Sequence, residues 1–105
     1  AGPVLLGGGA CVDDRVLRRL PPAARRHLHA VGGLYQHTLR WSLRHLGPRC
    51  RAVFGYCGDV LAERADLAVG FEKTRHPHLL IHCPVALPEA EREALVAIAH
   101  AASPF

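Results

Sequence analysis

The sequence lacks several residue types and patterns that mark common classes of protein. It has no methionine, a single tryptophan, and a single lysine against twelve arginines. The shortage of lysine is typical of proteins from GC-rich genomes, so we expect a bacterial source. No apolar run approaches the roughly 18 residues that a membrane-spanning helix needs. We therefore expect a cytoplasmic protein with no membrane partner.

The sequence also lacks the patterns of a zinc, disulfide or nucleotide site. Its four cysteines are scattered and include no Cys-x-x-Cys pair: Cys11, Cys50, Cys57 and Cys83. The glycines at positions 7–9 are followed by no lysine, serine or threonine in the frame of a phosphate-binding loop. Half of the 105 residues are hydrophobic, enough for one core without disulfide bonds. We expect a single domain over residues 1–105, of which 1–21 are a poorly defined N-terminal segment, with reduced thiols and no cofactor.

The hydrophobic pattern that is present predicts an α+β fold. Apolar residues recur about every 3.6 positions over residues 23–46, which predicts one long central helix. The period then changes to two, and three strands are predicted at residues 50–56, 67–72 and 78–87. Pro88 begins a closing C-terminal helix. Because the connections are short, we expect a mainly antiparallel three-stranded sheet with the helices on one face.

Charge is distributed unevenly along the chain. Nine arginines and no acid lie within residues 15–51, whereas acids outnumber bases by seven to four from residue 59 onward. The helical period gathers three of these arginines opposite the apolar stripe: Arg26, Arg40 and Arg44. Such a face can bind phosphates, so a basic nucleic-acid or partner-binding domain is one alternative function.

The aromatic residues argue against nucleic acid as a partner. Proteins that bind single strands combine basic charge with exposed aromatic side chains. Here Tyr35, Phe54 and Tyr56 fall on predicted core faces, and Trp41 lies on a stripe that flanks the core face of the long helix. A tryptophan there extends the core or seats a second subunit. We therefore expect a solvated basic face and no nucleic-acid partner.

Three histidines near the last predicted strand form a second alternative, a metal-binding module. On an extended strand, His76, His78 and His82 project from the same face. Imidazole nitrogens ligate divalent metals, with help from a thiolate or carboxylate. His78 and His82 would stand about 13 Å apart along a strand, because each residue rises 3.3 Å. One ion can bind both only if the strand bends or a partner adds ligands. The competing interpretation is that these histidines simply lie on the more solvated face of the sheet.

Three segments match pieces of one known family in order and spacing. Residues 30–40, AVGGLYQHTLR, are similar to the family's central helix. Residues 68–73, AVGFEK, followed by LLIH at 79–82, are similar to the strand pair after that helix. Residues 87–104 are similar to the closing helix, which in the family runs into Cys-Pro. Through these segments, residues 29–105 resemble the OsmC/Ohr family of organic-hydroperoxide and osmotic-stress proteins.

The resemblance implies an intertwined homodimer with helices at its centre. Leu34 and Ser103 stand where the family has the two cysteines that reduce peroxide, so it implies no peroxidase activity here. It implies a small dimeric stress-response or ligand-binding protein that holds a hydrophobic or anionic small molecule in the dimer cleft. The expected cleft residues are Leu34, His37, Trp41 and Ser103, among which His37 is the group best able to do acid–base work.

Overall fold

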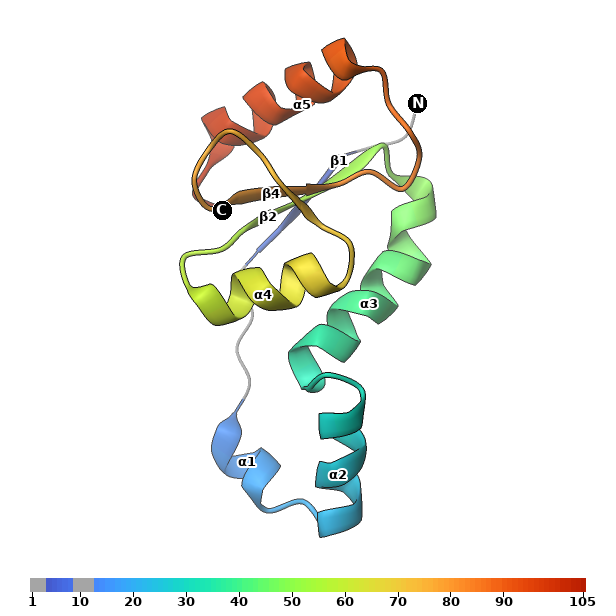
Figure 1. The fold of residues 1–105 in the computed structure, drawn as a ribbon, viewed down its shortest axis with the longest axis vertical. Coiled ribbons are helices and arrows are strands. Elements are labelled where there is room, and N and C mark those ends of the chain that lie inside the picture. The colour runs from blue at the N-terminus through green and yellow to red at the C-terminus, as the bar shows by residue number, and fades with distance from the viewer. Residues whose placement is uncertain (1–3, 9–12) are drawn as a thin grey trace.

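The computed structural model describes residues 4–8 and 13–105. Its strands are β1 (Val4–Gly7), β2 (Ala52–Tyr56), β3 (Glu72–Lys73) and β4 (Leu79–His82). Its helices are α1 (Asp14–Arg18), α2 (Pro22–Ala30), α3 (Leu34–Leu46), α4 (Val60–Ala68) and α5 (Glu89–Ala102), with a 3-10 turn η1 (Gly47–Arg49) after α3. The sheet lies between α5 and the pair α3 and α4, and α1 and α2 project below it (Figure 1). Within the described ranges, no helix has both the length and the apolar character needed to cross a membrane.

The strands form one mixed sheet of four strands in the order β1-β2-β4-β3. β1 runs parallel to β2, with Val4 opposite Ala52, and β4 runs antiparallel to both β2 and β3. The mixture of helices and strands agrees with the predicted α+β class, and two of the three strand pairs are antiparallel as predicted, but the sheet has four strands and not three. The missing strand, β1, lies in the segment that the sequence left undefined, and its partner stands far along the chain. A parallel pair needs a long crossover, which α1, α2 and α3 supply.

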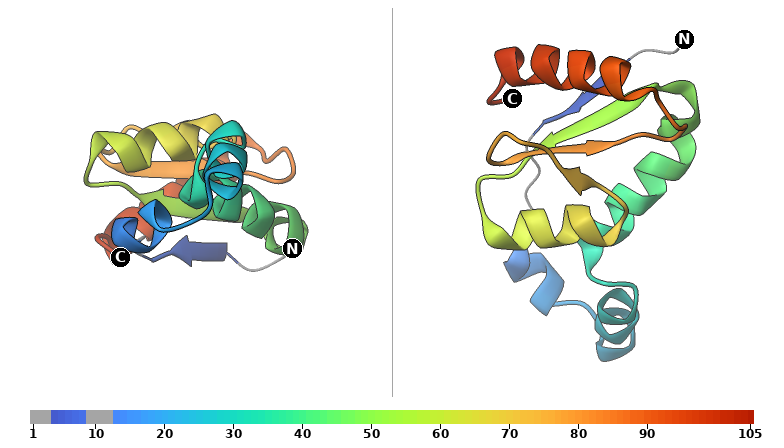
Figure 2. Two further views of the ribbon diagram at one scale, coloured as in Figure 1. Left: turned by 90° about the horizontal axis from the view of Figure 1, so that it is seen from below. Right: turned by 45° about the horizontal axis from the view of Figure 1, so that its top comes forward.

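Helices cover both faces of the sheet, which corrects the expectation of a one-sided cover. Alternation along β2 sends Phe54 to one face and Val53 to the other. Phe54 packs with Ile81 and with Val96 of α5. Val53 packs with Leu80 and with apolar residues of α3 and α4. Because the central strands are apolar on both faces, each face needs its own helical layer, as Figure 2 shows from two further sides.

The long helix predicted over residues 23–46 is two helices, α2 and α3, divided at Gly32 and Gly33. These glycines have φ angles of 90° and 92°, a backbone region that glycine enters without steric cost. The Gly33 N–H donates a hydrogen bond of 2.8 Å to the Leu28 carbonyl, which ends α2. The break turns α1 and α2 away from the sheet, and we call residues 14–30 the arm (Figure 1). Neither arm helix contains a buried residue.

The strand predicted at residues 67–72 is mostly wrong, because Leu67 and Ala68 belong to α4 and only Glu72 enters a strand. The Asp59 carboxylate accepts a hydrogen bond of 2.8 Å from the Ala62 N–H and caps this helix at its start. The chain then turns at Gly70, whose φ is 110°. Only the end of the expected strand enters the sheet, as the two-residue β3.

The predictions for the remaining elements hold in part. β2 confirms the strand expected at residues 50–56, and α5 confirms the helix expected after Pro88. β4 lies within the strand expected at residues 78–87 but is much shorter. Pro84, two positions after β4 ends, has no N–H to offer to a neighbouring strand.

Candidate ligand-binding cleft

A cleft of about 800 Å³ opens at the ends of the two parallel strands. Gly7 and Gly8 line it at the end of β1, and Cys57 lines it directly after β2. Residues of α3 and α4 line it as well, and so does Leu17 of the arm. Ligands of open α/β sheets bind outside the carboxyl ends of the strands. The position of this cleft therefore makes it the candidate site.

Asp66 of α4 is a charged residue buried at this cleft, with 3% of its surface exposed. Its Oδ1 accepts a hydrogen bond of 3.0 Å from the hydroxyl of Tyr35 on α3. Its Oδ2 accepts a hydrogen bond of 3.0 Å from the thiol of Cys57. The carboxylate thus joins two helices and the end of a central strand.

Gly55 on β2 leaves the space that this carboxylate occupies. A Cβ atom at position 55 would lie 2.6 Å from Asp66 Oδ2, closer than non-bonded atoms approach. Alternation along the strand puts position 55 on the same face as Val53 and Cys57, the face that α4 covers. A glycine here lets α4 bring Asp66 directly against the sheet.

The surroundings of Asp66 keep both of its donors protonated. The pKa of Cys57 is raised to about 12, first by burial and then by the hydrogen bond to Asp66 and the charge of that carboxylate. The pKa of Tyr35 is raised well above its usual value, first by burial and then by the charge of Asp66 and the hydrogen bond to that carboxylate. A thiol with so high a pKa donates a hydrogen bond at neutral pH and is not a thiolate nucleophile. Cys57 and Tyr35 therefore hold the carboxylate in place.

The cleft carries negative side chains without positive ones. Asp14, Asp59 and Asp66 line it, whereas the described lining includes no Lys, Arg or His. Asp14 pairs with Arg18 at 2.5 Å, and Asp59 caps α4. No ion pair within residues 4–8 and 13–105 includes Asp66, and the seven residues outside these ranges have no basic side chain. Asp66 is thus a buried carboxylate without a basic partner.

The rest of the lining is largely apolar. Its large apolar side chains are Leu17, Leu34, Leu39, Val53, Leu61 and Phe71. An apolar wall around a buried carboxylate suits a ligand with an apolar body and a cationic or hydrogen-donating head. The same charge disfavours an anionic ligand, one of the two kinds expected from the sequence.

A single chain does not bring the four predicted cleft residues together. Leu34 lines the cleft, but His37 is exposed on α3 and is not among the lining residues. Trp41 is 53% exposed, and its ring stacks on His45 with centroids 4.0 Å apart. Ser103 follows α5 on the opposite face of the sheet, where its hydroxyl donates to the His100 carbonyl at 2.6 Å. The expectation that Trp41 extends the core of one chain is therefore wrong.

The sequence pointed to Tyr35, Cys57 and Asp66 neither as a set nor as neighbours. One signal was available in α4, where Asp66 shares a helical face with Ala62 and Val69, both packed against the core. An acid within an apolar helical stripe indicates a buried carboxylate with a specific partner. That signal stays hidden unless residues 60–68 are recognised as a helix.

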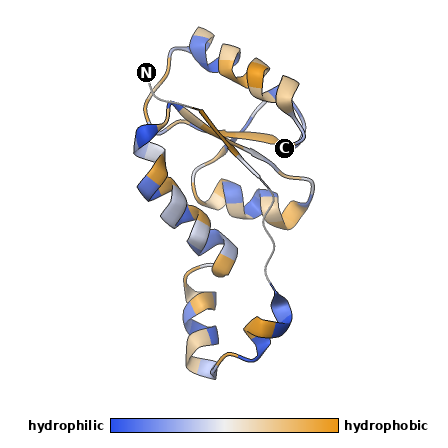
Figure 3. Cartoon of the chain, turned by 180° about the vertical axis from the view of Figure 1, so that it is seen from behind, coloured by the Kyte–Doolittle hydropathy of each residue, from blue (hydrophilic) through white to orange (hydrophobic). Residues whose placement is uncertain are grey.

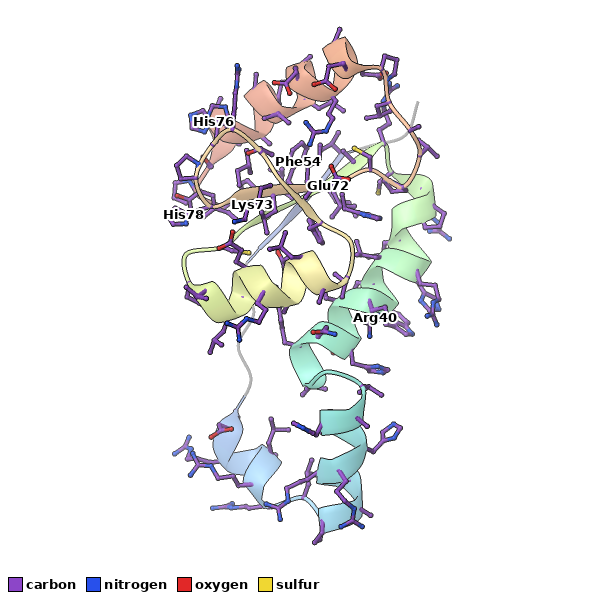
Figure 4. The ribbon with its side chains drawn as sticks, in the orientation of Figure 1. Arg40, Phe54, Glu72, Lys73, His76 and His78 are labelled. Carbon is purple, nitrogen blue, oxygen red and sulfur yellow. The ribbon has the colours of Figure 1, made fainter. Side chains whose placement is uncertain are left out.

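The structure also separates the three histidines of the metal alternative. His76 stacks on His100 with centroids 3.6 Å apart, and His78, at a φ of 71°, meets the ring of Tyr56 edge-on. His82 Nδ1 lies 3.3 Å from the Gly70 carbonyl. β4 begins at Leu79, so His76 and His78 lie in the preceding turn and not on the strand face (Figure 4). In the part of the chain that the structure describes, no group of three His, Cys, Asp or Glu side chains is arranged to hold a metal ion.

Comparison with known proteins adds no assignment. No family model, curated protein or solved structure matches this chain. The OsmC/Ohr resemblance, the homodimer and the stress-response role that it implies stay predictions.

Proposed function

We propose that this protein binds a small organic cation in the cleft, and that the Asp66 carboxylate recognises it. The observation that carries the proposal is a carboxylate only 3% exposed, at the cleft, without a basic side chain as its partner. Taking a charge out of water opposes folding by several kcal/mol unless it is compensated. Two hydrogen bonds from neutral groups offset part of this penalty, and a bound cation would offset more. Charges held in such surroundings concentrate at functional sites.

The hydrogen bonds of Asp66 leave acceptor capacity for a ligand. A carboxylate oxygen accepts two hydrogen bonds. Oδ1 receives one from Tyr35 and Oδ2 receives one from Cys57 within the protein. Because these two donors already fix the carboxylate, a ligand ammonium group finds it preorganised and loses little affinity to rearrangement.

The volume and the lining of the cleft indicate the size and polarity of the ligand. Its volume of about 800 Å³ is typical of sites for small organic molecules. Leu34, Leu61 and Phe71 offer apolar contacts around the carboxylate. An aromatic or aliphatic amine therefore fits better than a sugar or a phosphate ester.

Two probes of equal shape and opposite charge test the proposal. Benzylamine carries an ammonium group at neutral pH, and benzoate carries a carboxylate on the same ring. We expect benzylamine to shift the backbone amide NMR signals of Tyr35, Cys57 and Asp66 in a saturable way, and benzoate to leave them unchanged. Asp66→Asn removes the charge and should weaken benzylamine binding at least about tenfold, or 1.4 kcal/mol. Glu89→Gln removes an equal charge from an exposed position on α5 and should have no effect.

A second variant keeps the test independent of folding. Leu61 lines the cleft but is 74% exposed, so Leu61→Arg adds a cation beside the site without disturbing the core. It should weaken benzylamine binding and strengthen that of benzoate. Equal binding of the two probes to the natural chain, or no response to either variant, would contradict the proposal.

A further inference from the structure

The outer face of α3 combines basic and aromatic side chains. The helical period brings together five side chains on the flank turned away from Leu39 and Leu43, which pack on the core. We call them the α3 face: His37, Arg40, Trp41, Arg44 and His45. Trp41 is 53% exposed and stacks on His45 with an interplanar angle of 22°. Arg40 is labelled on α3 in Figure 4.

The arginines around this face are left out of the protein's own ion pairs. In the described part of the chain, the paired bases are Arg15, Arg18, Arg51, Lys73, Arg75 and Arg92. None of the six arginines within residues 19–49 is among them, and that segment contains no acid. Hydrophilic residues recur along the arm and α3 (Figure 3). The basic charge of this segment is therefore free to meet an external anion.

The acids of the chain are already committed elsewhere. Six of the nine form ion pairs, Asp59 caps α4, and Asp66 holds Tyr35 and Cys57. Glu89 is the one that remains. A second copy of this chain would have to give up these contacts to complement the α3 face, so a partner that brings its own anions fits the face better.

We propose that the α3 face binds single-stranded nucleic acid, with a base stacked on Trp41 and phosphates on Arg40 and Arg44. Proteins that bind single strands join basic charge to exposed aromatic rings, because every base has a face that stacks. An acidic peptide would satisfy the arginines but leave the exposed indole ring of Trp41 without a matching partner. This function is separate from the cleft, because none of the five residues of the α3 face is among those that line it.

Trp41 provides the readout, because it is the only tryptophan in the chain. We expect oligothymidylate to quench its fluorescence in a saturable titration at low salt. Polyaspartate, an anion without bases, should leave the fluorescence unchanged. Two phosphates bound to Arg40 and Arg44 contribute about −1.4 to the slope of log affinity against log salt concentration, at −0.7 per phosphate.

Variants assign the binding to named residues. The double variant Arg40→Gln/Arg44→Gln should flatten the salt slope by about 1.4. Arg64→Gln removes an exposed arginine of α4 that is also outside the ion pairs and should leave affinity and slope unchanged. Trp41→Ala, followed through the anisotropy of a labelled oligothymidylate, should weaken binding at least about tenfold, because base stacking on an aromatic ring contributes 1–3 kcal/mol.

Several results would overturn the proposal. Absence of quenching at low salt would exclude a base on Trp41. Equal weakening of binding by Arg64→Gln would show that the oligonucleotide is attracted by net charge alone. Equal quenching by polyaspartate would show that the α3 face binds acidic proteins instead. Trp41 fluorescence that changes with protein concentration alone, together with a dimer in sedimentation, would make this face a contact between two copies.

Discussion

The Tyr35 hydroxyl and the Asp66 carboxylate meet at 3.0 Å although 31 positions separate them in the chain. This contact ties α3 to α4 at the cleft. Tyr35 therefore contributes to the fold and to the candidate site at once. Replacing its hydroxyl group measures what the contact contributes to the fold.

We expect Tyr35→Phe to lower the free energy of unfolding by about 1–3 kcal/mol, because it leaves a buried carboxylate oxygen short of a donor. Urea denaturation followed by circular dichroism measures the change. Tyr56→Phe removes the hydroxyl of the other tyrosine, which donates no hydrogen bond to Asp66, and serves as the matched control. Equal effects of the two variants would show that the contact with Asp66 contributes nothing specific.

Stability should fall in alkaline solution because of Cys57. An ordinary thiol loses its proton near pH 9, whereas the pKa of Cys57 in the folded protein is about 12. The unfolded chain therefore releases a proton that the folded chain retains, so this contribution is complete below pH 9 and is lost between pH 9 and 12. The loss approaches about 1.4 kcal/mol per pH unit within that window.

Cys57→Ser isolates this contribution, since serine keeps a donor but does not titrate in the window. Urea denaturation at several pH values between 7 and 10.5 should give a flatter profile for the variant than for the natural chain. The raised pKa of Tyr35 adds a decline in both proteins at the upper end. Parallel profiles would mean that the thiol is not held protonated by its surroundings.

Gly55→Ala should disturb the cleft directly. The new methyl group would fall 2.6 Å from Asp66 Oδ2, so the carboxylate must move away from Cys57 or β2 must shift. Overpacking of this kind destabilises by about 1–3 kcal/mol, and thermal unfolding should show it. Gly58→Ala is the control, because no atom lies within 4 Å of a Cβ there. A cleft that tolerates alanine at position 55 would indicate that Asp66 is not held against β2.

Gly33→Ala tests why the long predicted helix is divided. A Cβ at position 33 meets no atom within 4 Å, so the only penalty is the backbone φ of 92°. An alanine forced into that conformation lowers the stability of the protein by about 1–3 kcal/mol. We expect a lower midpoint of unfolding, or a rise in helical circular dichroism if α2 and α3 join. An unchanged protein would show that the division does not depend on glycine.

Local patterns in the sequence predicted the elements whose start and stop signals are local. The alternation at residues 50–56 predicted β2, and Pro88 predicted the start of α5, because period and proline geometry act over a few residues. The uneven distribution of charge could also be seen in the sequence, because it does not depend on how the chain folds. The two positive φ angles at Gly32 and Gly33 are local too, but the apolar period that runs across both glycines predicted a single helix. The cap at Asp59 is also local, but the alternation at residues 67–72 predicted a strand where α4 ends.

Tertiary structure decided everything that depends on residues distant in the chain. β1 became a strand only by pairing with β2, and that pairing placed the cleft at the carboxyl ends of both. Packing of α4 on the sheet brought Asp66 to Tyr35 and Cys57, while the packing of α3 through Leu39 and Leu43 left Trp41 exposed. A sequence shows which side chains are available, but the contacts between distant side chains depend on how the whole chain packs to minimise its free energy. The site, and the exposure of Trp41 beside the basic charge, are therefore properties of the fold.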